Sequence, residues 1–248
     1  MKRLALAALL ALTACAPSQT TSTQAPYAPA PLQAAFSDAG VLWSVNGRAF
    51  IARAPDFRAQ AVGLPASAGA VAWQGSGLTA VPWVALPAYG LIVTASGAPD
   101  TQQVGRVAAL SSLAVYRADG TALSYGGSSA TGLPSAPSAV VTGGDGVDYA
   151  LVAGALYRVG TTLPLDSAAG PVLFATPTGA ASGDAPTLVT NQGSYSLTGG
   201  ELVYRDPTGA VRARVKQASA ALGLVGGRVA VLEVSGRLSF FAPDLGPG

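Results

Sequence analysis

The feature that most constrains the fold is a hairpin unit that recurs along the chain. Its clearest copy covers residues 196–215, where two runs rich in Val, Leu and Tyr flank the turn Pro207-Thr208-Gly209, and Gly199-Gly200 precede the first run. Residues of high strand propensity on both sides of a glycine-containing turn predict strand, turn and strand. A chain made of such units is expected to form short antiparallel sheets.

Further hairpins are predicted at regular places in the chain. The strands of one hairpin are joined by the two-residue turn Asn46-Gly47, which can adopt the positive φ of a type I′ turn. The others are centred near Gly90, Ser112, Gly154, Gly200 and Gly236, and successive centres from Gly47 onward are 43, 22, 42, 46 and 36 residues apart. Three of these intervals approach the length of one four-stranded propeller blade. The short interval leaves two explanations open, a blade that lacks strands or an insertion at residues 82–105.

Two kinds of strand can be distinguished by their residues. An apolar-Tyr-Arg phrase precedes a turn at residues 115–117, 156–158 and 203–205, which suits a strand near the outer edge of a blade. Plainer runs rich in small apolar residues lie at 69–73, 138–141, 172–175 and 222–225. We interpret these runs as the innermost strands, because the centre of a propeller is crowded.

This pattern resembles that of β-propellers over roughly residues 35–245, although no motif of a named subfamily is present. The resemblance implies an all-β fold with five or six short antiparallel blades. It also implies that the strand-like run at the end of the chain pairs with residues 36–45, which would close the ring and leave no open edge. A β-sandwich or a solenoid made of the same hairpins is the main alternative.

The composition agrees with many short, buried strands. Half of the 248 residues are apolar and a tenth are charged, against roughly a quarter charged in an average soluble domain. Most strand faces must therefore be buried. The 31 Gly and 18 Pro are spread along the chain, as expected where turns separate many strands.

The N-terminal residues predict a cleaved export signal. Lys2 and Arg3 precede a run of Leu and Ala at residues 4–11, which is too short to cross ~30 Å of hydrocarbon. The residues that follow, Leu12-Thr13-Ala14-Cys15, resemble the lipobox of bacterial lipoproteins. The resemblance implies that a signal peptidase recognises Leu12, Thr13 and Ala14 and that Cys15, the only cysteine, is acylated. The alternative is a chance cysteine after a plain secretory signal.

The chain then divides into a signal peptide (1–14), a lipidated cysteine with a Pro/Ser/Thr-rich tether (15–34) and a propeller-like domain (35–248). A tether of this composition is expected to remain extended, and several acyl chains give stable membrane anchoring. The residue after the cysteine is Ala16, not Asp. Under the sorting rule known for lipoproteins of bacteria with two membranes, such a residue resembles that of proteins sent to the outer membrane. We therefore expect a lipid-anchored protein of the cell envelope, on the periplasmic side of the outer membrane.

The densest group of like charges after the signal is Arg212, Arg214 and Lys216. Their alternation would place all three on one face of a strand, where they could bind an anionic partner surface or a lipid headgroup. The alternative is the solvated face of an outer strand. Residues 143–148 fit the first part of a calcium-binding nonapeptide, but the motif occurs once, so we interpret it as a tight turn.

The sequence offers few residues for catalysis. Histidine is absent, which removes the commonest general base and zinc ligand, and the many serines have no partner base. No Cys/His metal set, phosphate-binding loop or pair of catalytic carboxylates is evident, so we expect no catalytic residue, metal or cofactor. Without Lys2 and Arg3 the chain has 12 cationic and 12 acidic residues, which does not favour nucleic-acid binding.

These observations favour a non-enzymatic envelope lipoprotein whose propeller faces or blade edges bind other envelope proteins. In outline it resembles the propeller lipoproteins that assist outer-membrane assembly. The second hypothesis is a metal-dependent propeller that binds or hydrolyses sugars or lactones, which requires Asp and Asn side chains from several blades to converge at one mouth of the ring. A purely structural envelope component is the third.

Overall fold

The computed structural model describes residues 32–96, 100–130, 132–217 and 219–246, and this part of the chain is all-β. Its 24 strands form seven antiparallel sheets, and one 3-10 turn, η1 (Gly77–Thr79), interrupts them. The predicted fold class is confirmed. Within these residues no helix has the length and apolar character needed to cross a bilayer.

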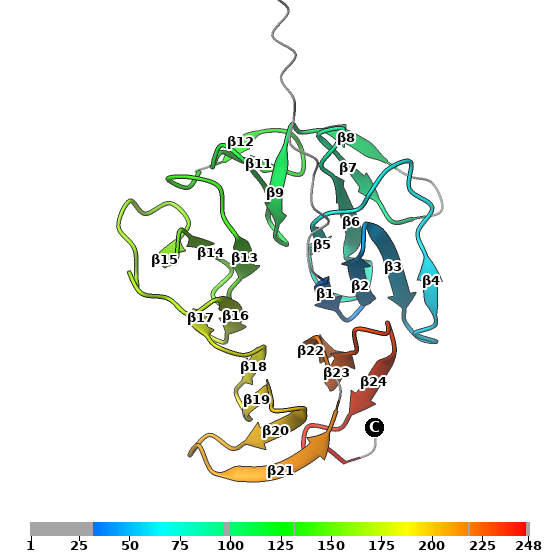
Figure 1. Cartoon of the computed structure of the whole chain (residues 1–248), viewed down its shortest axis with the longest axis vertical. Helices are drawn as coiled ribbons and strands as arrows, with labels where there is room; N and C mark the ends of the chain where they lie inside the picture. The colour runs from blue at the N-terminus through cyan, green and yellow to red at the C-terminus, as the bar shows by residue number, and fades with distance from the viewer. Residues whose placement is uncertain (1–31, 97–99, 131, 218, 247–248) are drawn as a thin grey trace, which may run out of the picture.

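Six of the sheets have three or four strands and are the blades of a propeller (Figure 1). The first three blades contain β1 (Gln33–Ser37), β2 (Gly40–Val45), β3 (Arg48–Arg53) and β4 (Ala59–Ala61); β5 (Val71–Gln74), β6 (Val81–Leu86), β7 (Leu91–Thr94) and β8 (Thr101–Gln103); and β9 (Val107–Leu110), β10 (Ala114–Arg117), β11 (Ala122–Ser124) and β12 (Ser129–Ala130). The other three contain β13 (Ala139–Thr142), β14 (Asp148–Val152) and β15 (Ala155–Arg158); β18 (Thr187–Thr190), β19 (Gly193–Thr198), β20 (Glu201–Arg205) and β21 (Val211–Lys216); and β22 (Ala221–Val225), β23 (Arg228–Leu232) and β24 (Leu238–Phe241).

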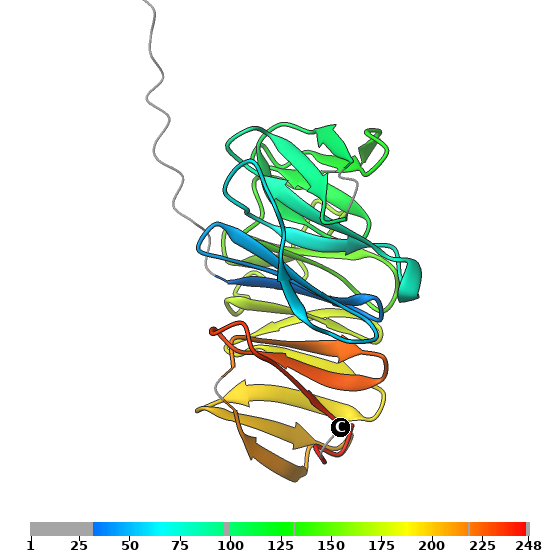
Figure 2. The ribbon, with the colours of Figure 1, turned by 90° about the vertical axis from the view of Figure 1, so that its right-hand side faces the viewer.

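A seventh, two-stranded sheet has its own place in the ring. It consists of β16 (Val172–Thr176) and β17 (Gly179–Gly183), and it lies between the blade of β13–β15 and that of β18–β21. Six blades of three or four strands agree with the predicted five or six, whereas the additional hairpin was not predicted. Seen from the side, the strands cross the thickness of a flat ring (Figure 2).

The predicted hairpins are present, and the strand order explains their uneven spacing. Asn46 and Gly47 both have positive φ, as a type I′ turn requires, and they join β2 to β3. Most of the hairpins likewise join the second and third strands of a blade, but the turn at Ser112 joins β9 to β10, the first and second. The interval from Gly90 to Ser112 is therefore short because the turn at Ser112 comes one strand earlier in its blade than the other hairpin turns do in theirs. Neither a missing strand nor an insertion is needed to explain it.

The predicted inner strands are confirmed as β5, β13, β16 and β22, each of which is the first strand of its sheet and faces the centre of the ring. The apolar-Tyr-Arg phrase is less regular. It lies on β15, which is the outer strand of its sheet, and on β20, which is the third of four strands. On β10 the prediction is wrong, because β10 is the second strand and Tyr116 is buried between sheets.

The ring closes by packing, not by strand exchange. The prediction that the last strand pairs with residues 36–45 is wrong, because β24 pairs with β23 alone and β1 belongs to the first sheet. Instead, Val41 and Trp43 form one buried cluster with Val225 and Leu232 of the last blade. Side chains of this size exclude water without a shared strand, and this burial stabilises the closure.

The core is divided among the contacts between successive sheets. The largest buried clusters each join residues of two neighbours: Leu42 with Val84, and Trp83 with Val115, are examples. The buried clusters thus cover both faces of five of the sheets, whereas no cluster of the described residues joins β16–β17 to the blade of β18–β21. This arrangement explains the apolar, charge-poor composition of the strands.

Candidate functional site

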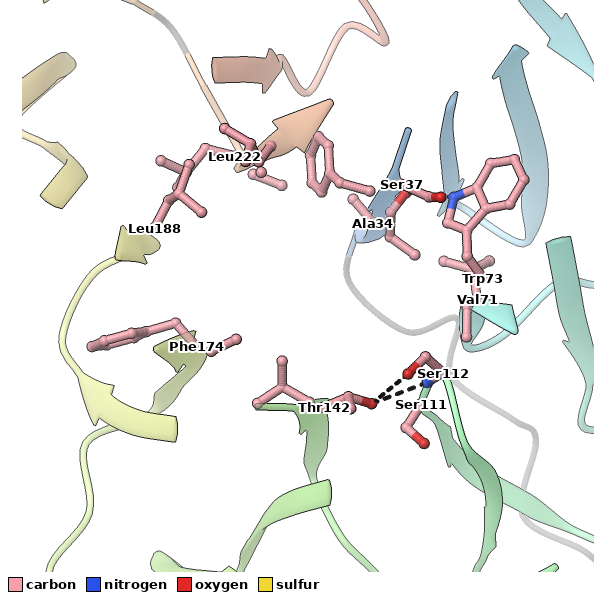
Figure 3. A pocket seen from close by; sticks show the side chains of 18 of the residues that line it. Ala34, Ser37, Val71, Trp73, Ser111, Ser112, Thr142, Phe174, Leu188 and Leu222 are labelled. Atoms are coloured by element: carbon pink, nitrogen blue, oxygen red, sulfur yellow. Dashed lines mark hydrogen bonds between the residues drawn. The ribbon is translucent and has the colours of Figure 1, made fainter. Parts of the chain in front are cut away.

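A cavity of about 650 Å³ runs through the centre of the ring. Its volume lies in the range of small-molecule sites, which is roughly 300–1,000 Å³. Residues of all seven first strands line it: β1, β5, β9, β13, β16, β18 and β22. Figure 3 shows the lining side chains arranged around an open centre.

The wall of the cavity is mainly apolar. Val71, Val140, Leu188 and Leu222 are among the side chains that line it. Among the described lining residues the single charged group is Asp38, an exposed residue in the turn between β1 and β2. Its Oδ1 accepts a hydrogen bond from the N–H of Gly226, at 2.9 Å. The cavity therefore has one carboxylate at one mouth.

Several hydroxyl groups near the wall are bonded within the protein. The Ser112 hydroxyl donates a hydrogen bond to Thr142 Oγ1 at 2.7 Å (Figure 3). The Thr142 hydroxyl in turn donates to Asp148 Oδ1 at 2.6 Å. Ser37 donates to the Gly77 carbonyl at 3.3 Å. Because these groups are already paired, they leave the wall less polar than its composition suggests.

Asp148 is a buried carboxylate that joins two blades. Its Oδ2 accepts hydrogen bonds from the hydroxyls of Ser111 at 2.5 Å and Tyr116 at 2.7 Å, while Thr142 bonds its Oδ1. Ser111 and Tyr116 belong to the third blade, whereas Thr142 and Asp148 belong to the fourth. Burial, followed by the nearby Asp148 charge, raises the pKa of Tyr116, so that this phenol remains a proton donor.

Sequence reasoning missed this carboxylate. Asp148 was grouped with the turn at residues 143–148, but it is the first residue of β14, whose five residues are all buried. A signal was present in the sequence, since the apolar run Tyr149–Val152 follows it directly and its strand begins there. Its partner Ser111, 37 residues away, gave no such signal.

The turn interpretation of residues 143–147 is confirmed. They connect β13 to β14, and the N–H of Gly143 donates to the Val147 carbonyl at 2.8 Å. A side chain on Gly143 or Gly144 would meet the backbone of residues 177–179, so close packing against the β16–β17 turn favours glycine here. Asp145 accepts a bond from Tyr149 Oη at 2.8 Å, which lowers its pKa. Among the described residues, no group of three or more His, Cys, Asp or Glu is arranged to hold a metal ion.

The cationic residues of β21 lie as their alternation predicts. Arg212, Arg214 and Lys216 are all exposed on β21, which is the outer strand of its four-stranded sheet. Arg212 Nη2 lies 2.6 Å from Asp206, and Arg214 Nη1 lies 3.0 Å from Glu201. The side chains of the two arginines remain 62% and 54% exposed. We name Arg212, Arg214 and Lys216 the β21 stripe.

Asp206 is the best-bonded of the acids beside the β21 stripe. Its Oδ1 accepts the Thr208 hydroxyl at 2.6 Å and the N–H of Ala210 at 3.1 Å, and its Oδ2 accepts Arg212. These hydrogen bonds, that of the Thr208 side chain foremost, lower the pKa of Asp206 to about 2. The turn before β21 is therefore closed by a carboxylate that stays ionised in neutral solution.

The predicted lipidation site lies outside the described residues. Leu12, Thr13, Ala14 and Cys15 all precede Leu32, where the described part of the chain begins. Their predicted roles remain predictions.

Comparisons with known proteins show a likeness of fold. No family model matches the chain, and no curated protein matches it. Part of PorZ, a surface component of the type-IX secretion system of Porphyromonas gingivalis, is similar with a TM-score of 0.52 at 11% identity, over 85% of this chain and 36% of PorZ. A chain of the mitotic checkpoint complex matches at 0.45 and 13% identity, over 96% of this chain and 85% of that one. Virginiamycin B lyase from Staphylococcus aureus matches at 0.42 and 12% identity, over 86% of this chain and 88% of the lyase.

Proposed function

We propose that the chain is a lipid-anchored protein of the cell envelope, held in the membrane through Cys15, whose propeller is a non-enzymatic scaffold for another envelope protein. The partner surface that we propose is acidic, and it binds the β21 stripe. The lipobox-like residues 12–15 and the tether support the anchoring. PorZ, part of which has a similar fold, is described as a bacterial surface component, which is compatible with this location.

The observation that carries the proposal is the form of β21. It has six residues, its outer edge pairs with no strand of the described chain, and its three cations are exposed. An unpaired strand edge presents alternate N–H and C=O groups, to which an extended segment of a partner can add. The β21 stripe would then select acidic side chains on that segment.

The ion pairs of the stripe prepare it for such a partner. Asp206 and Glu201 hold Arg212 and Arg214 near the strand, while Lys216 makes no ion pair with any described residue. A guanidinium that is already oriented loses less conformational entropy when it binds a carboxylate. Charged edge strands also prevent aggregation, and the experiment below distinguishes that role from binding.

The test is a pull-down of the lipidated full chain from detergent-solubilised envelope. Wild type is compared with the variant in which Arg212, Arg214 and Lys216 are all changed to Glu. We expect wild type to recover an envelope protein with an acidic exposed segment, and the variant to lose at least about 90% of it.

The matched control changes three other exposed cations, Arg48, Arg58 and Arg106, to Glu, which gives the same net charge. This control is expected to recover the partner as wild type does. Equal losses in both variants would mean that net charge, not the stripe, decides recovery. If wild type recovers no partner above background and the β21 variant instead aggregates, the stripe serves to protect an edge and the proposal is wrong.

A further inference from the structure

We propose that the central cavity binds the amino-terminal end of a short apolar peptide, with the terminal ammonium group at Asp38. This site is separate from the β21 stripe, so it does not depend on the function proposed above. Three properties of the cavity support it: its charge, its unpaired strand edges and its apolar side chains.

The charge of the cavity selects a cation. Asp38 is the single charged residue among the described residues that line it, and no Lys or Arg is among them. One oxygen of Asp38 accepts the Gly226 N–H, and the other makes no hydrogen bond with the described residues. A ligand with one positive group can therefore pair with Asp38 without displacing an existing ion pair. An amino terminus is such a group, and it is ionised at neutral pH.

The backbone around the cavity is suited to a peptide. Each of the seven first strands is at the end of its sheet, so its inner edge pairs with no other strand. Some backbone groups of these strands bond neighbouring side chains, as the Ala35 carbonyl accepts Trp73 Nε1 at 3.1 Å. The N–H and C=O groups of the edge that lack such a partner must bond to water or to a ligand. A purely hydrocarbon ligand would leave these groups without partners. The amides of an extended peptide can satisfy them, as in other cases of strand addition.

The side chains between these edges favour apolar residues in the peptide. Val140, Val172, Leu188 and Leu222 line the cavity and are partly exposed to it. The hydroxyls of Ser112 and Thr142 are bonded to Thr142 and Asp148, respectively, so they do not compete for a polar ligand side chain. Burial of apolar peptide side chains against this wall supplies the affinity.

The experiment measures binding of the tetrapeptide Ala-Val-Leu-Val amide to the purified full chain by isothermal titration calorimetry. The same peptide with an acetylated amino terminus differs only in that charge. We expect the acetylated peptide to bind about fivefold to tenfold more weakly. In Asp38→Asn the two peptides are expected to bind equally, at the weaker level.

Two further variants locate the binding. Asp56→Asn removes the same charge from an exposed loop at the same end of the first blade, outside the cavity, and it is expected to behave as wild type. Val172→Trp fills the cavity from a residue that belongs to none of the buried clusters, and it should abolish binding of both peptides while the thermal unfolding midpoint stays near that of wild type.

The proposal is overturned if wild type binds neither peptide or binds both equally. It is also overturned if Asp56→Asn weakens binding as much as Asp38→Asn, since a general electrostatic effect would then be the cause. Undiminished binding to a folded Val172→Trp variant would place the peptide on the outer surface and would likewise contradict it.

Discussion

At the scale of single residues, Asp148 holds two blades together by hydrogen bonds. The residue is 4% exposed, and its carboxylate accepts hydrogen bonds from three hydroxyl groups, two of them from the neighbouring blade. No cation lies among these partners, so the three hydroxyls alone replace the hydration that the carboxyl group loses on burial. A carboxylate in this position makes the contact between the third and fourth blades directional, which apolar packing alone would not do.

Replacement of Asp148 by Ala is therefore expected to destabilise the protein by about 3 kcal/mol or more, because the hydroxyls of Ser111, Tyr116 and Thr142 lose their acceptor in a buried site. Urea unfolding at neutral pH measures the change. Asp184→Ala, in an exposed loop, is the control and is expected to stay within about 0.5 kcal/mol of wild type. A similarly small effect at Asp148 would show that its hydrogen bonds are dispensable.

The lowered pKa of Asp206 predicts that the stability of the protein depends on pH. Its pKa is about 2 in the folded chain and about 3.9 for an ordinary Asp, so the folded state favours the ionised form. The resulting stabilisation is complete above the ordinary pKa and is lost as the pH falls through about 2. The difference in unfolding midpoint between wild type and Asp206→Asn is thus expected to be constant above about pH 5 and to shrink between about pH 4 and pH 2.

Thr208→Val provides the control for that prediction. It removes the hydroxyl that bonds Asp206 and leaves the carboxylate in place, so the pKa of Asp206 should rise and the acid-dependent part of the stability should diminish. A wild-type advantage over Asp206→Asn that does not change from pH 7 to pH 2 would contradict the assignment.

At the scale of elements, the ring depends on the fit between β1 and β22. A Cβ at Gly223 would overlap the ring of Phe36, and the Asp38 side chain bonds the Gly226 N–H across the same junction. The absence of a side chain at Gly223 therefore lets the first and last blades approach. This contact performs the closure that strand exchange would otherwise provide.

We expect Gly223→Ala to cost about 1–3 kcal/mol, since the added methyl group must displace Phe36. Combination with Phe36→Leu, which offers a smaller side chain, should recover part of the loss in a double-mutant cycle. Gly63→Ala is the control, because an added methyl there meets nothing within 4 Å. Additive effects of Gly223→Ala and Phe36→Leu would show that the two residues do not interact.

The strands and turns also show how much of the fold could be predicted from the sequence. The turn at Asn46-Gly47 and the inner strands were predictable because adjacent residues determine them. The ring closure could not be predicted, since Asp38 and Gly226 are 188 residues apart in the sequence. The cavity could not be predicted either, because its wall takes a few residues from each blade. The two-stranded sheet was not predicted. Its strand β16 was expected as an inner strand, but nothing in the sequence indicated that only β17 would follow it.

At the scale of the whole molecule, the propeller has distinct surfaces. The outer edge of β21 and the central cavity are built from different strands, so one can be altered without the other. Anchoring through Cys15 would bring the β21 stripe close to proteins of the same membrane. We therefore predict that membrane attachment and partner binding act together, and that the loss of either one reduces assembly with the partner.

Photocrosslinking in intact cells tests this prediction directly, from a photoreactive residue at Val211, which is 39% exposed at the start of β21. We predict one discrete protein adduct with the wild-type chain. The adduct should disappear when Arg212, Arg214 and Lys216 are changed to Glu, and it should diminish strongly in Cys15→Ser, which lacks the thiol that we propose is acylated. No adduct, or an adduct that neither change affects, would contradict the account.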